Sequence, residues 1–274
     1  MTDQLNVTLN DGRVMPQLGL GVWQTPQDIT AEVVKTALAA GYRAIDTAAA
    51  YANERGVGEA LKSAPRDDIF VTTKLWNDNQ GYDSTLVAFD KSLGRLGLDA
   101  LDLYLIHWPA PRKGLYLDSW KALVRLKQEG RARSIGVSNF LPEHLERIIG
   151  ETGVVPAVNQ IELHPSFQQH ALRAVHAKHG ILTQSWSPLG QGRQLSDPVI
   201  GEIAKKHGKT PAQTIIRWHL DSGLIVIPKS VTPSRIAENI AVFDFKLDAD
   251  DMQRIAGLDR SNGRIGADPA TATF

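Results

Sequence analysis

The feature that most constrains the fold is a repeated alternation of short apolar runs and amphipathic helical segments. The runs are rich in Ile, Val and Leu and lie at 18–21, 43–46, 69–74, 101–107, 134–137, 158–161, 181–185 and 224–228. Such runs are typical of strands buried on both faces of a parallel sheet. Strands that alternate with single helices form right-handed βαβ units. Eight units in 274 residues predict a single α/β domain over 1–274, a (β/α)8 TIM barrel, with an open doubly wound sheet as the alternative.

Local signals define a hairpin and several helices. Residues 7–9 and 13–15 flank the turn sequence Asn10-Asp11-Gly12, which predicts an N-terminal β-hairpin. A helix is expected over 28–40 with Ile29, Val33, Ala37 and Ala40 on its inner face. Asp83 is expected to cap another helix. Three more helices should begin at prolines, which suit the first helical turn: Pro142, Pro211 and Pro233.

Composition excludes several classes of function. The chain has 30 basic and 30 acidic residues, so a nucleic-acid or other polyanion partner is not expected. It has no cysteine, which excludes disulfides, thiolate nucleophiles and thiolate metal sites. No basic or apolar leader opens the chain, and no run approaches the ~18 apolar residues of a membrane span. We therefore expect a cytoplasmic monomer that does not contact membranes.

Common cofactor and metal motifs fail in this chain. Gly19-Leu20-Gly21 begins like a dinucleotide-binding turn, but Gln24 stands where the third glycine belongs. His176 and His179 share a helical face without an acidic partner, and we expect both to be surface residues rather than ligands. The sequence predicts neither a Rossmann nucleotide site nor a metal site.

Polar residues finish three successive apolar runs. Asp46 ends the second run, with Tyr51 in the loop after it; Lys74 ends the third and His107 the fourth. In a barrel the carboxyl ends of the strands form the active site, so we expect these side chains to meet there. Isolated buried charges cost several kcal/mol and persist when they are paired or used. The alternatives are a purely structural Asp46–Lys74 pair and a core histidine that only packs.

The chemistry of this group favours carbonyl reduction. An ammonium beside a phenol should lower the pKa of Tyr51, so that Tyr51 can give a proton to a substrate oxygen near neutral pH. Asp46 would hold Lys74 in place and keep it charged, and His107 would orient the carbonyl. The group contains no strong nucleophile, so acyl transfer is not indicated. A general acid with an oxyanion stabiliser suits reduction by hydride from a cofactor.

Tryptophans gather at the same positions. Four of the six follow expected strands: Trp23, Trp76, Trp108 and Trp186. Together they predict an apolar cup of the kind that hydride transfer requires, in which one indole stacks on a nicotinamide ring. Taken singly, each could equally be loop packing. Trp120 and Trp218 fall inside expected helices and are assigned to packing.

These residues lie in stretches that resemble the aldo-keto reductase family along nearly the whole chain. The stretches are GYRAIDTA at 41–48, KLW at 74–76, LDLYLIHWP at 101–109, SIGVSNF at 134–140, NQIELHP at 159–165 and IPKS at 227–230. VVPAVNQ at 154–160 and WSPLGQG at 186–192 are most similar to the bacterial branch that contains 2,5-diketo-D-gluconate reductases.

The resemblance implies NADPH as cofactor and gives roles to individual residues. Tyr51 would donate the proton, with Lys74 and Asp46 in support and His107 on the carbonyl. Ser138, Asn139 and Gln160 would hold the nicotinamide carboxamide beneath Trp186. The remaining cofactor positions would be Gly21, Val22, Trp23, Asp46, Ser187, Leu189, Gln191, Gly192, Lys229, Ser230, Val231, Thr232, Arg235, Glu238 and Asn239. The substrate pocket would be lined by Trp23, Tyr51, Trp76, His107 and Trp108.

The last part of the cofactor set would read the 2′-phosphate and the adenine. Lys229, Ser230 and Arg235 suit a phosphate chemically, although without the family context they could be ordinary solvated groups at a helix start. Thr232 stands where relatives can carry Arg, which removes one cation from this part.

The resemblance implies reduction of a ketone or aldehyde, such as 2,5-diketo-D-gluconate or a small α-dicarbonyl compound. The tail from Gly263 to Phe274 matches the family only to about Ala267; tails of this kind cover the pocket in the family. Two other functions stay open: a slow nucleotide-sensing module on the same fold, and an unrelated barrel enzyme with a phosphorylated substrate.

Overall fold

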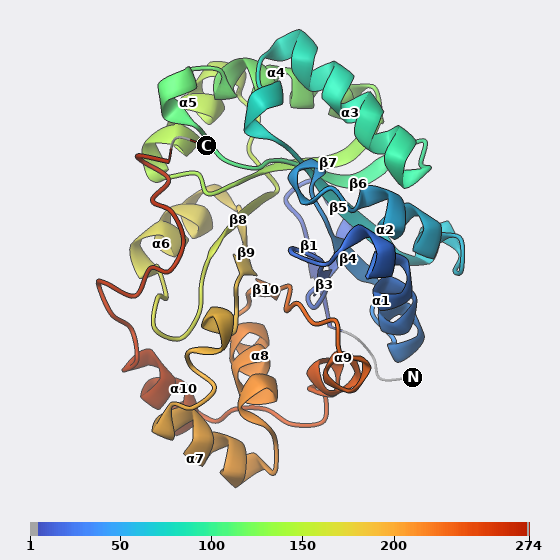
Figure 1. Ribbon diagram of the computed structural model, residues 1–274. Helices are drawn as coiled ribbons and strands as arrows, with labels where there is room; N and C mark the ends of the chain where they lie inside the picture. Colours follow the sequence, from blue (N-terminus) through green and yellow to red (C-terminus); the bar gives the residue numbers. More distant parts are fainter. Residues whose placement is uncertain (1–4, 273) are drawn as a thin grey trace.

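A closed barrel of parallel strands forms the centre of the molecule (Figure 1). The computed structural model describes residues 5–272 and 274. The strands of the barrel are β3 (Leu20–Gly21), β4 (Ala44–Asp46), β5 (Phe70–Leu75), β6 (Leu101–Ile106), β7 (Ala132–Ser138), β8 (Val158–Glu162), β9 (Leu182–Trp186) and β10 (Ile225–Val226). Each pairs with its sequence neighbours, and the ring closes where Leu18 bridges Val226 and the Gly21 amide donates to Pro228 O at 3.1 Å. The predicted (β/α)8 barrel is confirmed, and its closure excludes the open sheet.

Helices surround the barrel on its outside (Figure 1). They are α1 (Gln27–Ala40), α2 (Glu54–Leu61), α3 (Tyr82–Leu96), α4 (Tyr116–Gln128), α5 (Pro142–Thr152), α6 (His170–His179), α7 (Pro198–His207), α8 (Pro211–Asp221), α9 (Pro233–Ile240) and α10 (Ala249–Ala256). The three helix starts predicted at prolines are confirmed. Within the described residues, no helix has the length and apolar character needed to cross a bilayer.

The predicted hairpin closes the end of the barrel at which the strands begin. Strands β1 (Asn6–Thr8) and β2 (Val14–Pro16) pair antiparallel, with Val7 opposite Met15. Leu9 and Met15 are buried in one apolar cluster with Phe70, Leu103 and Leu105 of the barrel. The hairpin therefore seals the end of the barrel that lies away from the carboxyl ends of the strands.

Two expected helix details were wrong. The N-cap of α3 is Gly81, so Asp83 lies in the first turn, where its charge complements the helix dipole instead of capping it. On the expected inner face of α1, Val33 and Ala37 are buried and Ala40 packs against the core, but Ile29 is 39% exposed. Thr30 occupies the buried position in the first turn instead. The helix packs against α2 and α9.

The expected surface position of His176 was also wrong. His176 is buried on α6, with Nε2 at 2.9 Å from Asn159 Nδ2 and Nδ1 at 2.8 Å from Thr183 Oγ1. It links the helix to β8 and β9, and burial lowers its pKa to about 4, so it serves the core as a neutral ring. His179 is partly exposed and lies 2.9 Å from Glu146 Oε1.

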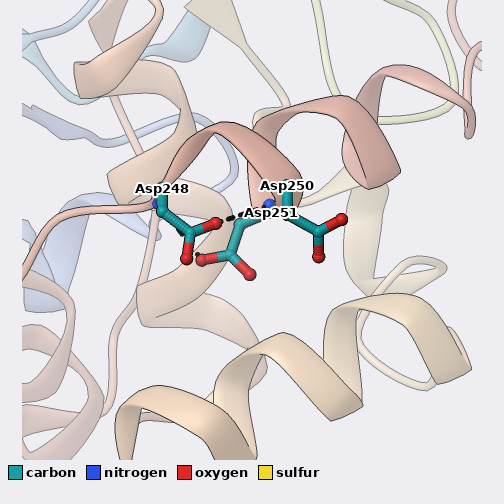
Figure 2. Close-up of side chains that lie close together, drawn as sticks. All are labelled: Asp248, Asp250 and Asp251. Carbon is teal, nitrogen blue, oxygen red and sulfur yellow. Dashed lines mark hydrogen bonds between the residues drawn. The ribbon is translucent and has the colours of Figure 1, made fainter.

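An acidic cluster at the start of α10 is a helix cap. Figure 2 shows the Asp248 and Asp251 carboxylates close together, with Asp250 directed away from them. Asp248 Oδ1 accepts a hydrogen bond from the Asp251 backbone amide at 3.0 Å, and Asp251 Oδ2 accepts one from the Asp248 backbone amide at 3.2 Å. Lys206 donates to both carboxylates, and the His207 ring lies 2.7 Å from Asp251. These contacts engage the carboxylates and tie α10 to α7.

Close packing in the barrel wall predicts a stability difference between two glycines. A Cβ at Gly136 of β7 would lie 2.6 Å from Val158 O and 2.8 Å from Leu105 Cδ2, whereas a Cβ at Gly94 of α3 meets nothing within 4 Å. Overpacking costs ~1–3 kcal/mol, so Gly136→Ala should lower the free energy of unfolding by that amount. The control Gly94→Ala should raise it by up to ~1 kcal/mol. Urea unfolding followed by tryptophan fluorescence measures both. Equal stability of the two variants would contradict the packing described.

Candidate active site

The carboxyl ends of the barrel strands surround a cavity of about 630 Å³. Among the residues expected at the site, those that line it are Gly21, Trp23, Asp46, Tyr51, Trp76, His107, Trp108, Ser138, Asn139, Gln160, Trp186, Ser187, Gln191 and Lys229. Ala50, Pro188 and Ile227 also line it and were not expected at the site, and so do Gly266, Ala267 and Phe274 of the tail that the family resemblance places over the pocket. Residues far apart in the chain thus meet at one mouth.

A buried ion pair lies at the base of the cavity. The Lys74 side chain, fully buried on β5, donates from Nζ to Asp46 Oδ1 on β4 and to the Thr47 carbonyl oxygen at 2.9 Å. Tyr51 lies on a 3-10 turn (Ala49–Tyr51) directly after β4, and its Oη is 3.4 Å from Lys74 Nζ. The charges are satisfied by short hydrogen bonds, as burial at this depth requires. The structure therefore brings the expected Asp, Lys and Tyr into one hydrogen-bonded group.

Burial dominates the electrostatics of this group. It raises the pKa of Tyr51 above its ordinary value, because desolvation of a phenolate outweighs the favourable Lys74 charge, and Asp46 adds to the rise. The expectation of a lowered Tyr51 pKa was therefore wrong. For Lys74, burial lowers the pKa, but the Asp46 carboxylate and Tyr51 reverse that effect and the net direction is upward. Lys74 stays charged, as expected, and Tyr51 keeps its proton at neutral pH.

His107 lies directly after β6 and faces the cavity beside Tyr51. Its ring makes edge contacts with the rings of Tyr51 and Trp76, at centroid distances of 5.6 and 5.3 Å. Burial, followed by the nearby Lys74 charge, holds the pKa of His107 well below 6.5, so the ring is neutral at pH 7. Nδ1 is buried without a hydrogen-bond partner among the described residues. The other nitrogen, Nε2, also forms no hydrogen bond with a described residue, so a neutral ring can offer it to a carbonyl without carrying charge.

Amide side chains connect the acid–base group to the next strands. Gln160 of β8 donates from Nε2 to Asp46 Oδ2 at 2.7 Å and to Gln184 Oε1 at 2.9 Å. Asn139, held at a φ of 63°, donates to the His107 carbonyl oxygen at 3.0 Å and accepts from Trp186 Nε1 at 2.8 Å. Ser138 Oγ donates to the Gln160 carbonyl oxygen at 2.7 Å. The direct contact between Gln160 and Asp46 was not expected from the sequence.

The predicted tryptophan cup is present, and the end of the chain extends it. Trp23, Trp76, Trp108 and Trp186 all line the cavity, whereas Trp120 and Trp218 are buried in helices as expected. The ring of Phe274 lies parallel to Trp76 at 5.9 Å and edge-on to Trp108 at 5.0 Å. Asn77 Nδ2 donates to Phe274 O at 2.6 Å. The partners of Phe274 could not be found from the sequence, because Trp76 and Trp108 lie more than 160 positions before it.

The other expected cofactor residues lie outside the lining of the cavity. Val22 is fully buried, Leu189 packs against the apolar core, and Gly192 follows Gln191 in the loop after β9. Ser230 Oγ accepts from the Thr232 amide at 3.1 Å just before α9. Glu238 accepts from Thr210 Oγ1 at 2.8 Å and ties α9 to α8, and Asn239 is buried on the same helix. Val231 and Arg235 are exposed.

Two features of the outer rim suit an extended anionic ligand. The side chains of Lys229 and Arg235 form no hydrogen bond or ion pair with another residue within 5–272 and 274. In the loop after β9, Ser187, Gly190, Gln191 and Gly192 all have φ between 47° and 89°. Left-handed residues in a loop can turn successive backbone N–H groups toward one anion. In this loop the Gly190 and Gly192 amides already donate to Ser187 O at 2.8 Å and Leu189 O at 2.9 Å. The rim therefore offers two free cations beside a loop of left-handed residues, next to an apolar cup.

Comparisons with known proteins agree with this geometry. A family model described as the aldo/keto reductase family matches residues 16–260. An aldo-keto reductase of Mycolicibacterium smegmatis is 61% identical over 270 residues, covering 98% of each chain. Methylglyoxal reductase DkgA of Escherichia coli strain K12 is 55% identical over 273 residues, with the same coverage. The crystal structure of a Gox0644 mutant in complex with NADPH is similar at a TM-score of 0.97 and 63% identity, covering 99% of each chain.

Proposed function

Because this chain belongs to the aldo/keto reductase family, we propose that its cavity reduces the carbonyl group of a small ketone or aldehyde to an alcohol. The chain is an NADPH-dependent oxidoreductase, as the family and the NADPH complex of its structural neighbour indicate. The candidate substrates are a keto sugar acid such as 2,5-diketo-D-gluconate and a small α-dicarbonyl compound. The methylglyoxal reductases among the relatives support the second class.

The observation that carries the proposal is the position of Lys74. Its ammonium is fully buried, bonded to Asp46, and 3.4 Å from the Tyr51 hydroxyl. An ion pair that only stabilised the barrel would need neither a phenol beside its ammonium nor a cavity next to that phenol. Tyr51 and Asp46 both line the cavity, so the pair connects directly to the space where a substrate would bind.

The rim and the cup fit the parts of NADPH. Ser138, Asn139 and Gln160 would hold the carboxamide, with Trp186 stacked on the nicotinamide ring. Gly21, Val22, Trp23 and the loop 187–192 would follow the sugar and the pyrophosphate. Lys229, Ser230, Val231, Thr232, Arg235, Glu238 and Asn239 would hold the 2′-phosphate and the adenine. When bound, NADPH supplies the hydride that the carbonyl carbon accepts.

Tyr51 completes the reduction by proton transfer. As the carbonyl carbon gains hydride, its oxygen gains negative charge and takes the proton from Tyr51 Oη, which leaves a phenolate. The Lys74 ammonium stabilises that phenolate, and Asp46 keeps the ammonium in place and charged. A proton from solvent then restores the phenol. The raised Tyr51 pKa ensures that the proton is present before the reaction begins.

His107 orients the substrate for this transfer. A neutral imidazole can donate one hydrogen bond to the carbonyl oxygen without adding positive charge beside Lys74. Its edge contacts with Tyr51 and Trp76 fix the plane of the ring. The four tryptophans exclude water around the reacting carbon, which strengthens each of these polar contacts.

Monomeric state and cytoplasmic location stay predictions of the sequence. Size-exclusion chromatography with light scattering would measure the oligomeric state.

The proton-donor role predicts how kcat changes when the hydroxyl oxygen of Tyr51 is removed. Tyr51→Phe should lower kcat by roughly 10²–10⁴-fold, the usual value of general acid catalysis, and leave the Kd for NADPH nearly unchanged. Tyr82→Phe, which removes a hydroxyl from the outer surface of α3, should retain wild-type kcat. Both are assayed with methylglyoxal and 2,5-diketo-D-gluconate at saturating NADPH. A Tyr51→Phe enzyme with half the wild-type rate would overturn the assignment.

The rim cations predict cofactor choice. NADPH and NADH differ by the 2′-phosphate, and each charge-assisted hydrogen bond contributes roughly 1.5–3 kcal/mol, where ~1.4 kcal/mol is tenfold in affinity. Arg235→Ala or Lys229→Ala should therefore weaken NADPH binding about 10- to 100-fold and leave NADH binding unchanged. Fluorescence titration at one ionic strength measures both Kd values, with Lys205→Ala on the surface of α7 as the control. Equal weakening of NADPH and NADH would show that these residues only shape the loop.

A further inference from the structure

A buried carboxylate at the end of β8 holds the last segment of the chain. Glu162 is 1% exposed, and its Oε1 and Oε2 accept from the backbone amides of Ile265 at 2.6 Å and Gly266 at 2.9 Å. The His164 ring lies 3.0 Å from Oε1. Burial raises the pKa of Glu162, but His164 and the two amides reverse that effect and hold it below its ordinary value. Glu162 is therefore ionised and fully engaged with the tail.

The held segment packs directly on the cofactor-side tryptophan. A Cβ at Gly266 would lie 2.5 Å from Trp186 Cη2, so the backbone at this position contacts the indole. Glu162 and Trp186 are partners in the β8–β9 register. On its other edge the indole donates from Nε1 to Asn139. Trp186 is thus fixed between Asn139 and the tail segment that Glu162 holds.

The same segment leads to the carbonyl end of the cavity. After α10 the chain runs past α6 toward the mouth of the barrel (Figure 1). Gly266 and Ala267 line the cavity, and Phe274 covers Trp76 and Trp108. The root of the tail is fixed separately, because the Arg260 amide donates to Ser166 O at 3.2 Å and the Arg264 guanidinium lies 4.9 Å from the Phe167 ring centroid. Glu162 is therefore the polar anchor between the root of the tail and its end.

A hydrogen-bonded chain orients this anchor. His164 Nδ1 lies 3.2 Å from Ser166 Oγ, which accepts from Gln194 Nε2 at 2.7 Å. Gln194 belongs to the loop after β9, and its side chain fills the space beside Gly190. The carboxylate is thus held in one orientation by groups that connect it to the proposed pyrophosphate loop.

We propose that Glu162 is a positioning residue: its carboxylate holds Ile265 and Gly266 so that the tail closes the carbonyl end of the cavity and fixes the Trp186 indole. The proposal rests on the proposed carbonyl reduction for its kinetic consequence, whereas its structural consequence can be measured without any turnover. The competing account is that Glu162 and His164 form a buried pair that only stabilises the barrel.

Limited trypsinolysis tests the anchor without reference to activity. The Arg264–Ile265 peptide bond contains the N–H group that donates to Glu162. The Arg260–Ser261 bond lies before this contact and serves as an internal reference. Glu162→Gln keeps the shape of the side chain but places its NH2 group against a backbone N–H, so one of the two hydrogen bonds to the tail is lost. Loss of one charge-assisted bond should speed release of the peptide 265–274 about 10- to 100-fold relative to release of 261–274. Glu54→Gln, which alters an equally buried carboxylate bonded to Thr73 and Arg95, is the matched control and should leave the ratio unchanged.

Kinetics with a shortened chain tests the consequence. Glu162→Gln should raise the KM for the carbonyl substrate about tenfold, equivalent to one lost charge-assisted bond. The Kd for NADPH should change little, because Asn139 still holds the Trp186 indole. In a chain that ends at Arg264, the same substitution should have no further effect on KM, because no tail is left to hold. If Glu162→Gln raised KM by the same factor in the full-length and shortened chains, the proposal would be overturned. It would also be overturned if the substitution left the relative rates of cleavage after Arg264 and Arg260 unchanged. If the wild type reduces no carbonyl, the proposed function fails, and the trypsin ratio still decides whether Glu162 holds the tail.

Discussion

The contact on which the rest of the site depends is the buried pair of Asp46 and Lys74. Moving two charges into a barrel costs several kcal/mol per ion unless hydrogen bonds replace the lost water. Here Lys74 reaches Asp46, Thr47 and Tyr51, and Asp46 also accepts from Gln160. Asp46 ends β4, and Thr47 and Tyr51 follow it directly, whereas Gln160 lies in the middle of β8. The pair therefore links strands β4, β5 and β8 at the base of the cavity and places the Lys74 charge beside the Tyr51 hydroxyl, as the proposed proton transfer requires.

In the proposed reduction, the environment of the pair lets Tyr51 keep its proton at neutral pH and still release it to the substrate. Burial raises the pKa of Tyr51, which keeps the phenol protonated at neutral pH, as a donor requires. The Lys74 charge offsets part of the cost of phenolate, so release is easier than burial alone would allow. His107 contributes as a neutral ring because burial and Lys74 both lower its pKa. The tryptophans and the anchored tail exclude water, which maintains all three effects.

The sequence predicted the barrel, the hairpin and the acid–base group because those features depend on local patterns. Strand ends in a barrel meet at one mouth whatever the loops do, so Asp46, Lys74 and His107 could be placed together from their positions alone. Contacts between distant segments were not accessible in this way. Glu162 meets the tail across more than 100 positions, and His176 is buried because α6 packs on β8 and β9. The Tyr51 pKa was misjudged because a sequence reveals a neighbouring charge but not the depth of burial.

The pH dependence of kcat for alcohol oxidation at saturating NADP tests the central claim most directly, since this direction requires the Tyr51 phenolate as base. In the wild type, kcat should rise with pH through the pKa of Tyr51. In Lys74→Met the charge that favours phenolate is lost while the phenol stays in an apolar site, so that midpoint should move to higher pH. The same midpoint in both enzymes, with only a lower kcat in the variant, would show that Lys74 does not control the Tyr51 proton and would contradict the account.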